Sequence, residues 1–298
     1  MNLWIVYNGF LPGKAFIDYA QMLQEAAIEL GHEAFLLSNE ELTPVLAENR
    51  KQIIHNRKRP DAVLFTDKDI YLARQLENES IPVFNQAEAI EVSDDKIKTY
   101  QALYKNNVPI PKTIIAPKTF GFTKQIESKF IEKLESNLSY PLIIKEAFGS
   151  FGEQVYLIKH RQALIEKMKT LIHVPYLFQE FIHTSIGEDK RIQVVGDEVV
   201  TAMQRKSATD FRSNITAGGT MNPYSPTSME EDVAIQASQA IGAHFSGVDL
   251  LLGSNNEPIV CEVNSNAHIR NLYDCTGINA AFDIVKYVTR RIEKEKNK

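Results

Sequence analysis

The sequence contains little cysteine, no long apolar run and no excess of basic charge. Only Cys261 and Cys275 occur in 298 residues, and their spacing is not that of a metal site. This favours a reducing compartment and a protein without structural zinc. The net charge of −5 argues against nucleic acid or a membrane surface as a partner. No apolar run approaches the length that a membrane-spanning helix needs.

The first residues also lack the marks of a secretion signal. The stretch "MNLWIVYNGFLPGK" has no basic segment and only a short apolar run, so we expect no signal peptide and a cytoplasmic protein. It also lacks the pattern G-x-G-x-x-G that a dinucleotide-binding fold places after its first strand. A hydrophobic fraction of 44% fits an ordinary core, and the length fits two or three lobes. The oligomeric state stays open, a homo-oligomer included.

Strand and helix patterns alternate over the first ninety or so residues. We expect strands at 3–8, 32–38, 61–67 and 81–85, and helices at 15–31 and 70–79. This alternation predicts a parallel sheet with helices on its faces. A helix capped by Ser93 is expected next, ended by the prolines of "VPIPKT". Further along we expect helices at 161–172 and 229–245, a hairpin turning at Gly196, and a closing helix from about Asn279.

Two acidic residues interrupt the apolar strands of a second hairpin, "GVDLLLGSNNEPIVCEVNSN". If Leu252 faces Ile259, then Asp249 faces Glu262, and Asn264 lies on the same side. The opposite face would carry the apolar side chains Val248, Leu250, Leu252, Cys261 and Val263. Opposed like charges cost stability, but oxygen ligands focused on one point suit a hard cation such as Mg²⁺. A solvent-facing polar stripe would show the same alternation.

A lysine and a glycine-rich loop follow another apolar strand. Lys145 ends "PLIIKEA", and the backbone of the loop that contains Gly149, Ser150 and Gly152 can approach a phosphate closely. Lysine supplies a point charge to the same phosphate. Lys96, near the start of a helix, is a second candidate. The glycine-rich loop could instead be a simple turn between strands, and Lys96 could be a surface lysine.

The segment "LFQEFI" combines a polar pair with apolar neighbours. Gln179 and Glu180 could offer backbone groups to an adenine edge, while Phe181 and Ile182 wall the ring. The alternative is a buried strand with a polar pair at its edge.

The segment "QRKSATDFRSN" gathers basic and polar side chains in one stretch. Arg205, Lys206, Arg212, Ser213 and Asn214 could lie over a phosphate during its transfer. A solvated charged loop is the alternative.

Taken in order, these segments resemble the ATP-grasp superfamily, and most closely its RimK-like branch of carboxylate–amine ligases. The resemblance is carried by "PLIIKEAFGSFGEQV", "QEFI", "GEDKRIQVVGDEVV", "QRKSATDFRSN", "GVDLL" and "EVNSN", and covers the chain from about Ser93 onward. It implies an α/β fold with α+β lobes, in which two lobes clamp ATP. We expect an N-terminal pre-domain with a parallel sheet at 1–92, a central lobe at 93–176 and a C-terminal lobe with the metal site at 177–298.

The resemblance also implies roles for single residues. ATP would be bound by Lys96, Lys145, Gly149, Ser150, Gly152, Gln179, Glu180, Phe181, Ile182, Asp189 and Lys206. Asp189 would meet the ribose. The residues expected at the reaction centre are Arg191, Arg205, Arg212 and Asn214. Magnesium, or manganese in its place, would be held by Asp249, Glu262 and Asn264.

One segment departs from the family pattern. Relatives in this branch often follow "EVN" with a Ser-Pro-Gly turn, whereas this chain continues "SNAHIRNLYDCTGIN". His268 and Arg270 therefore enter the region that selects the acceptor, which puts glutamate ligation to a ribosomal protein in doubt. A surface arginine paired with Asp274 is the alternative for Arg270.

The expected activity is ATP-dependent amide formation. ATP would convert a carboxylate to an acyl phosphate, and an amine would attack it and release phosphate. The carboxylate could belong to a peptide, a protein or a small molecule. An ATP-grasp kinase that phosphorylates a hydroxyl, and a nucleotide-binding regulatory protein, are the rival hypotheses.

Overall fold

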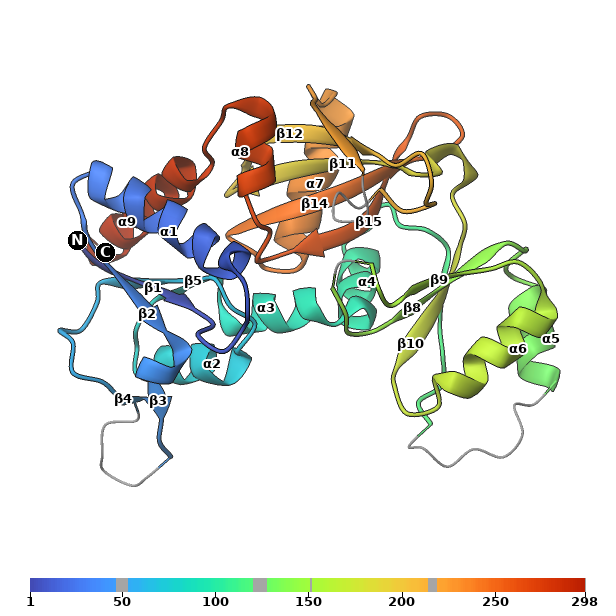
Figure 1. Ribbon diagram of the computed structural model, residues 1–298, viewed down its shortest axis with the longest axis horizontal. Helices are drawn as coiled ribbons and strands as arrows, with labels where there is room; N and C mark the ends of the chain where they lie inside the picture. The colour runs from blue at the N-terminus through green and yellow to red at the C-terminus, as the bar shows by residue number, and fades with distance from the viewer. Residues whose placement is uncertain (47–52, 120–127, 151, 214–218, 298) are drawn as a thin grey trace.

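Three main sheets divide the chain into lobes that lie in a row (Figure 1). The computed structural model describes residues 1–46, 53–119, 128–150, 152–213 and 219–297. The sheets have the strand orders β2-β1-β5-β6, β7-β10-β8-β9 and β13-β12-β11-β14-β15. The first is parallel, and the other two are antiparallel. This mixture confirms the predicted α/β class with a parallel N-terminal sheet.

Helices cover both faces of the parallel sheet, as the alternating pattern predicts. Its strands are β1 (Asn2–Tyr7), β2 (Glu33–Ser38), β5 (Ala62–Phe65) and β6 (Val83–Phe84). The helices of this lobe are α1 (Lys14–Glu29), α2 (Ile70–Asn78) and α3 (Ala87–Asp94). Short elements complete it: the 3₁₀ turn η1 (Asn39–Glu41) and the paired strands β3 (Thr43–Pro44) and β4 (Ile53–Ile54).

The last helix of the chain packs into the first lobe. In α9 (Ala281–Lys296), the buried residues Ile284, Val285 and Val288 share one core with α1 and with one face of β1 and β5. The two ends of the chain therefore lie close together (Figure 1). The amphipathic pattern predicts the helix but not its partner, because its apolar face could cover any of the sheets.

The second lobe carries the predicted strand–loop–strand unit. Strands β8 and β9 are antiparallel neighbours, and α5 and α6 share a buried core with this sheet. The elements are β7 (Thr113–Ile115), α5 (Ser128–Glu135), β8 (Leu142–Glu146), β9 (Val155–Ile158), α6 (Arg161–Thr170) and β10 (Tyr176–Glu180).

The third lobe has one apolar and one polar sheet face. Apolar side chains such as Val248, Leu250 and Val263 pack with α4 and α7, and the opposite face carries the charged residues of the predicted site. The strands are β11 (Glu188–Val195), β12 (Glu198–Lys206), β13 (Thr220–Pro223), β14 (Phe245–Leu252) and β15 (Pro258–Asn264). The helical elements are α4 (Lys96–Lys105), η2 (His183–Ser185), α7 (Ser228–Ala240) and α8 (Arg270–Thr276).

The predicted helix cap at Ser93 is wrong. Helix α3 contains Ser93 and ends at Asp94, and α4 is capped instead by the Asp95 side chain, which accepts hydrogen bonds from the amides of Ile97 and Lys98. The Ser93 hydroxyl donates to the Val263 carbonyl at 2.9 Å, a contact between segments remote in the sequence. A serine hydroxyl can cap a helix or bind the backbone of a distant strand, so the local sequence pattern cannot distinguish these two roles.

The register of the acidic hairpin is correct at the acids and wrong beyond them. The observed pairs are Val248–Val263, Asp249–Glu262, Leu250–Val260, Leu251–Ile259 and Leu252–Pro258. A bulge after Asp249 leaves one extra residue in β15, so Leu250 does not face Cys261 and Leu252 does not face Ile259. Cys261 therefore leaves the apolar face on which we expected it and lines a cleft beside Glu262.

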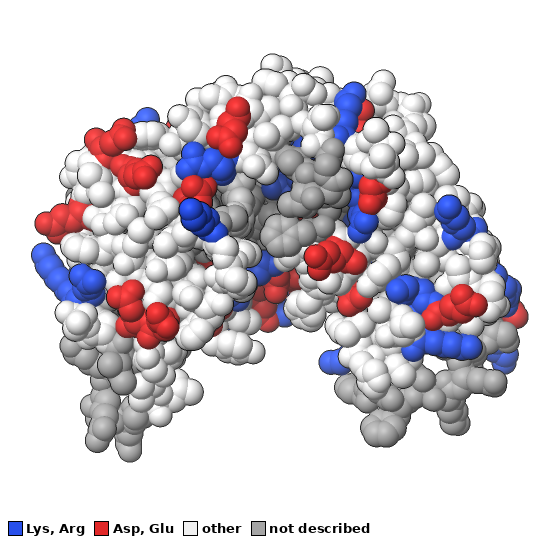
Figure 2. Space-filling view, in the orientation of Figure 1, with Lys and Arg blue, Asp and Glu red and all other residues white. Residues whose placement is uncertain are grey.

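Surface charges of both signs are interspersed on the face shown in Figure 2. A deep notch separates the first lobe from the second on the same face. Within the described part of the chain, no helix has the length and apolar character needed to cross a membrane.

Candidate functional site

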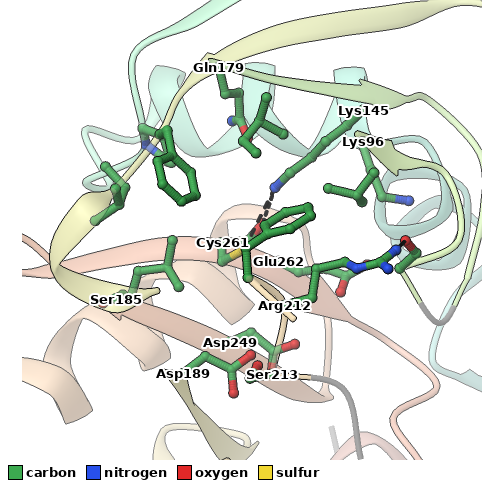
Figure 3. Close-up of a pocket in the computed structure, with 18 of the residues that line it drawn as sticks. Lys96, Lys145, Gln179, Ser185, Asp189, Arg212, Ser213, Asp249, Cys261 and Glu262 are labelled. Atoms are coloured by element: carbon green, nitrogen blue, oxygen red, sulfur yellow. Dashed lines mark hydrogen bonds between the residues drawn. The ribbon is translucent and has the colours of Figure 1, made fainter. Parts of the chain in front are cut away.

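A cleft of about 960 Å³, counted to its open mouth, lies between the second and third lobes. Lysines enter it from one side, and the acidic residues of the five-stranded sheet lie on the other (Figure 3). The predicted ATP-binding residues that line it are Lys96, Lys145, Gly149, Gly152, Gln179, Glu180, Phe181, Ile182 and Asp189. Of the residues predicted at the reaction centre or the metal, Arg205, Arg212, Asp249 and Glu262 line it as well. The fold thus gathers residues from much of the chain into one site.

One end of the cleft has apolar walls and fixed polar backbone. Ile143, Leu251 and Phe181 line it. At the end of β10, the Glu180 side chain accepts a hydrogen bond from the Lys112 amide at 2.6 Å, and Gln179 donates to the Thr113 hydroxyl at 2.9 Å. Because these side chains are held by their own lobe, the segment that joins the lobes keeps a defined course. An aromatic base fits such a slot, with a few placed polar groups to orient it.

Lys145 is a buried cation whose described contacts are neutral. Its side chain projects from the end of β8 into the cleft (Figure 3), and the residue is only 7% exposed. The ammonium donates to the Tyr100 hydroxyl at 3.0 Å and the Cys261 carbonyl at 3.4 Å. Among the residues that the structure describes, no carboxylate forms a salt bridge with it. Burying a charge without an ionic partner is costly, so this position favours an anionic ligand.

A second lysine holds the glycine-rich loop. The Lys96 ammonium donates to the Gly149 carbonyl at 2.9 Å, and Arg212 donates to the Gly152 carbonyl. The backbone of Gly149 and Gly152 has φ values of 143° and 73°, which side-chain-bearing residues rarely adopt. Burial lowers the pKa of Lys96, and the nearby Glu262 carboxylate opposes that shift. The loop is thus anchored by cations beside the expected phosphate position.

Arginines engage the central acids of the site. Arg205 donates to both oxygens of Asp189, at 2.7 and 2.6 Å, and lies 2.9 Å from Asp249. Arg191 also binds both oxygens of Asp249, one of them at 2.7 Å. Burial by itself raises the pKa of Asp249, but the two guanidinium groups outweigh it and hold that pKa below its usual value. For Asp189, burial outweighs Arg205 and raises the pKa.

The chemistry of the donor set fits a hard cation at Glu262 and Asn264. Both supply oxygen, and Glu262 lines both the cleft and a smaller polar pocket that Asn264 also lines. Asp249 faces Glu262 across the hairpin, but arginines occupy its oxygens, so it would have to exchange them to bind a metal. No group of three or more His, Cys, Asp or Glu side chains is placed for a metal in the described ranges.

Comparison with known proteins assigns the chain to a family. A family model described as a RimK-like ATP-grasp domain matches residues 93–288. The chain belongs to the RimK-like ATP-grasp family. It is 31% identical over 285 residues to a probable alpha-L-glutamate ligase of Trichodesmium erythraeum, covering 91% of this chain and 92% of that protein. It is 34% identical over 218 residues to human N-acetylaspartylglutamate synthase A, covering 70% and 54% of the two chains.

Solved structures show the same fold. The ATP-grasp ligase PsnB, complexed with a minimal precursor, Mg and ADP, superposes with a TM-score of 0.71 at 15% identity over 98% of each chain. The D-alanine–D-alanine ligase of Bacillus anthracis gives 0.73 at 16% identity over 99% of each chain. These findings confirm the predicted resemblance, the ATP-grasp fold and the ligase class of enzyme.

Two residues proposed for the acceptor lie against helix α1 of this ATP-grasp protein. Arg270 donates to both oxygens of Asp18, at 2.9 and 2.8 Å, and the alternative pairing with Asp274 is not among the salt bridges observed. The ring of His268 contacts that of Phe16, with centroids 5.6 Å apart. Neither residue lines the nucleotide cleft. Their role in acceptor binding stays a prediction.

Other predicted residues lie apart from the cleft lining. Lys206 is half exposed and pairs with Glu188 at 3.0 Å. Arg191 contacts Asp249 of the cleft but is not one of the lining residues, and Ser150 accepts a hydrogen bond from Lys68 at 3.3 Å. Asn214 lies outside the described residues.

Sequence reasoning missed Tyr100, Cys261 and Lys68. Tyr100 occupies an apolar helix position that looks like core, and Cys261 reaches the cleft only through the bulge. Lys68 belongs to the first lobe, where no motif marks it. No local signal could have identified any of them.

Proposed function

We propose that this chain is an ATP-dependent ligase that joins an amino acid, through its amine, to a carboxylate. The buried Lys145 ammonium carries the proposal, because it points into the cleft and forms no salt bridge in the described part of the chain. A phosphate would satisfy it. The names of the relatives, glutamate ligase and N-acetylaspartylglutamate synthase, support an amino acid as the amine substrate.

The reaction would proceed in two group transfers. A carboxylate oxygen of the first substrate attacks the terminal phosphorus of ATP, and the bond from that phosphorus to ADP breaks, which gives an acyl phosphate. The amine, after loss of a proton from its ammonium form, then attacks the acyl carbon. The carbon–oxygen bond to phosphate breaks, phosphate leaves with the electron pair, and a second proton passes from nitrogen to water.

The protein contributes charge and position rather than a nucleophile. Lys145 and Lys96 would neutralise phosphate oxygens, and the backbone of the loop at Gly149 would approach them closely. Arg205 would stabilise negative charge on the acyl phosphate while it holds Asp189 in place. Bound magnesium at Glu262 and its neighbours would supply further charge neutralisation to the phosphates. Such positioning can account for much of a rate enhancement.

A trapping assay tests this function. The purified protein is incubated with ATP, magnesium, hydroxylamine and pooled carboxylic acids, with ADP and hydroxamate measured together. We expect both products in equal amounts for at least one acid, because hydroxylamine intercepts acyl phosphates. ATP consumption with a stable phosphorylated alcohol would indicate a kinase, and ATP binding without turnover in any pool would indicate a regulatory protein. Either result would overturn the proposal.

A further inference from the structure

A smaller polar pocket adjoins the cleft at its cationic end. Its volume is about 320 Å³, counted to its open mouth. It shares Lys96, Gly149 and Glu262 with the nucleotide cleft, and none of the residues of the base-binding end. Its remaining lining is Lys68, Ser93, Asp94, Asn264, Ser265 and Asn266. A molecule in this pocket would therefore lie next to the expected phosphates.

One cation of the pocket comes from the first lobe. Lys68 follows the carboxyl end of β5, the edge of a parallel sheet at which ligands commonly bind. The preceding residue, Asp67, is held by hydrogen bonds to both its backbone and its side chain. The Asn266 amide donates to the Asp67 backbone carbonyl at 2.6 Å, and the Asn8 amide donates to the Asp67 carboxylate at 3.2 and 3.1 Å. These contacts of Asp67 keep the backbone next to Lys68 close to Asn266, in the segment that follows β15.

The pocket is also lined by an acid, Asp94. Asp94 ends α3, and its neighbour Ser93 bridges β15 by donating to the Val263 carbonyl and accepting from the Ser265 amide, both at 2.9 Å. The Lys68 ammonium forms a salt bridge with the Asp94 carboxylate across the pocket. Their side chains are 47% and 28% exposed. A partly exposed pair is weak, so a ligand can separate its members at little cost.

We propose that this pocket binds the α-amino acid that supplies the amine, with its carboxylate on Lys68 and its ammonium on Asp94. The inference rests on the proposed ligase function and names the site of its second substrate. The ion pair in the pocket matches the two charges of a zwitterion, and every lining residue is charged, polar or glycine. The amine would then lie beside the loop at Gly149 and beside Glu262, where the acyl phosphate forms.

Substrate charge gives the first test. Wild type and Lys68→Met are compared with the best L-amino acid from a phosphate-release screen and with its α-carboxamide, which lacks the negative charge. We expect Lys68→Met to raise the KM of the amino acid by at least about tenfold, the size of one charge-assisted contact. Wild type should prefer the amino acid to its carboxamide, and the variant should lose that preference. The control is Lys58→Met, an exposed lysine of the same lobe, which should change neither value.

Other parameters distinguish competing roles for Lys68. Because hydroxylamine replaces the amine, hydroxamate formation should fall less in Lys68→Met than amide formation with the amino acid. An equal fall in both would assign Lys68 to the carboxylate that becomes phosphorylated. A higher KM for ATP alone would assign it to the phosphate loop, through its contact with Ser150. Each of these outcomes overturns the proposal.

Direct binding separates this inference from the proposed function. Thermal unfolding of the protein with magnesium and a non-hydrolysable ATP analogue is measured with and without each of the standard L-amino acids. A rise in Tm for wild type that is lost in Lys68→Met and in Asp94→Asn supports the site even if no turnover is found. If no amino acid stabilises wild type at millimolar concentration, the site is refuted, whether or not the hydroxamate assay succeeds.

Discussion

Removal of Arg205 should expose how strongly the central acids depend on it. Arg205, Asp189 and Asp249 are 7%, 8% and 3% exposed, and the guanidinium makes three contacts with the two carboxylates, at 2.6 to 2.9 Å. Arg205→Met leaves the charge of Asp189 buried without its cation. Breaking a buried ion pair on one side typically costs about 3–5 kcal/mol. Asp249 keeps Arg191, so the loss comes mainly from Asp189.

A double-mutant cycle measures this coupling. Urea unfolding is followed for wild type, Arg205→Met, Asp189→Asn and the double variant, and the midpoints are compared at constant m-value. Because the double variant carries no unpaired charge, it should recover at least about 1 kcal/mol relative to the sum of the single losses. The adjacent Lys206→Met is the matched control, since its pair with Glu188 is exposed and worth less than about 1 kcal/mol.

The outcome that refutes this reasoning is specific. If Arg205→Met destabilises the protein no more than Lys206→Met, the three contacts contribute nothing beyond a surface pair. If the two substitutions of the cycle add without coupling, Asp189 does not depend on Arg205. Asp189 would then be free to meet the ribose, as the family resemblance implies, without prior exchange of a partner.

Three further results are expected. Lys145→Met should weaken ATP binding in calorimetry by at least about tenfold with little loss of Tm, because the lysine contributes a charge-assisted contact to phosphate; unchanged affinity would contradict its role. Glu262→Gln should keep the fold but lower turnover by orders of magnitude even at saturating magnesium, since it removes charge at the metal; near-normal turnover would remove Glu262 from the metal site. Burial lowers the pKa of His244 from 6.5 to about 4. Between pH 6.5 and pH 4 the unfolded chain therefore binds more protons than the folded protein. The free energy of unfolding should fall as the pH falls through this range, by about 3 kcal/mol in total. His244→Gln should flatten this pH dependence of urea unfolding, and an unchanged slope would assign it to another group.

The sequence determined the features that depend on neighbouring residues. Alternating strand and helix patterns predicted the parallel sheet of the first lobe, and side-chain alternation placed the two acids of the hairpin on one face. The predicted pairing of Asp249 with Glu262 is confirmed, but the turn does not set it, because the observed Leu252–Pro258 pair would place Asp249 opposite Cys261 if the bulge were absent. The order of strands and helices and the alternation of side chains along a strand can both be obtained from one stretch of chain. The strand and loop at Lys145 and Gly149 were predicted on the same basis. In these cases local pattern and final structure agree.

Only the tertiary structure decided which distant residues meet. The bulge that turns Cys261 into the cleft has no local signal, since the apolar run reads equally well without it. The arginines on Asp249, the packing of α9 against α1, and the arrival of Lys68 beside Asp94 all join segments far apart in the chain. Side-chain pattern states which face of an element is apolar or charged, but many partners satisfy the same face. The choice among them is made by the packing of all lobes at once, and it is this packing that forms both pockets.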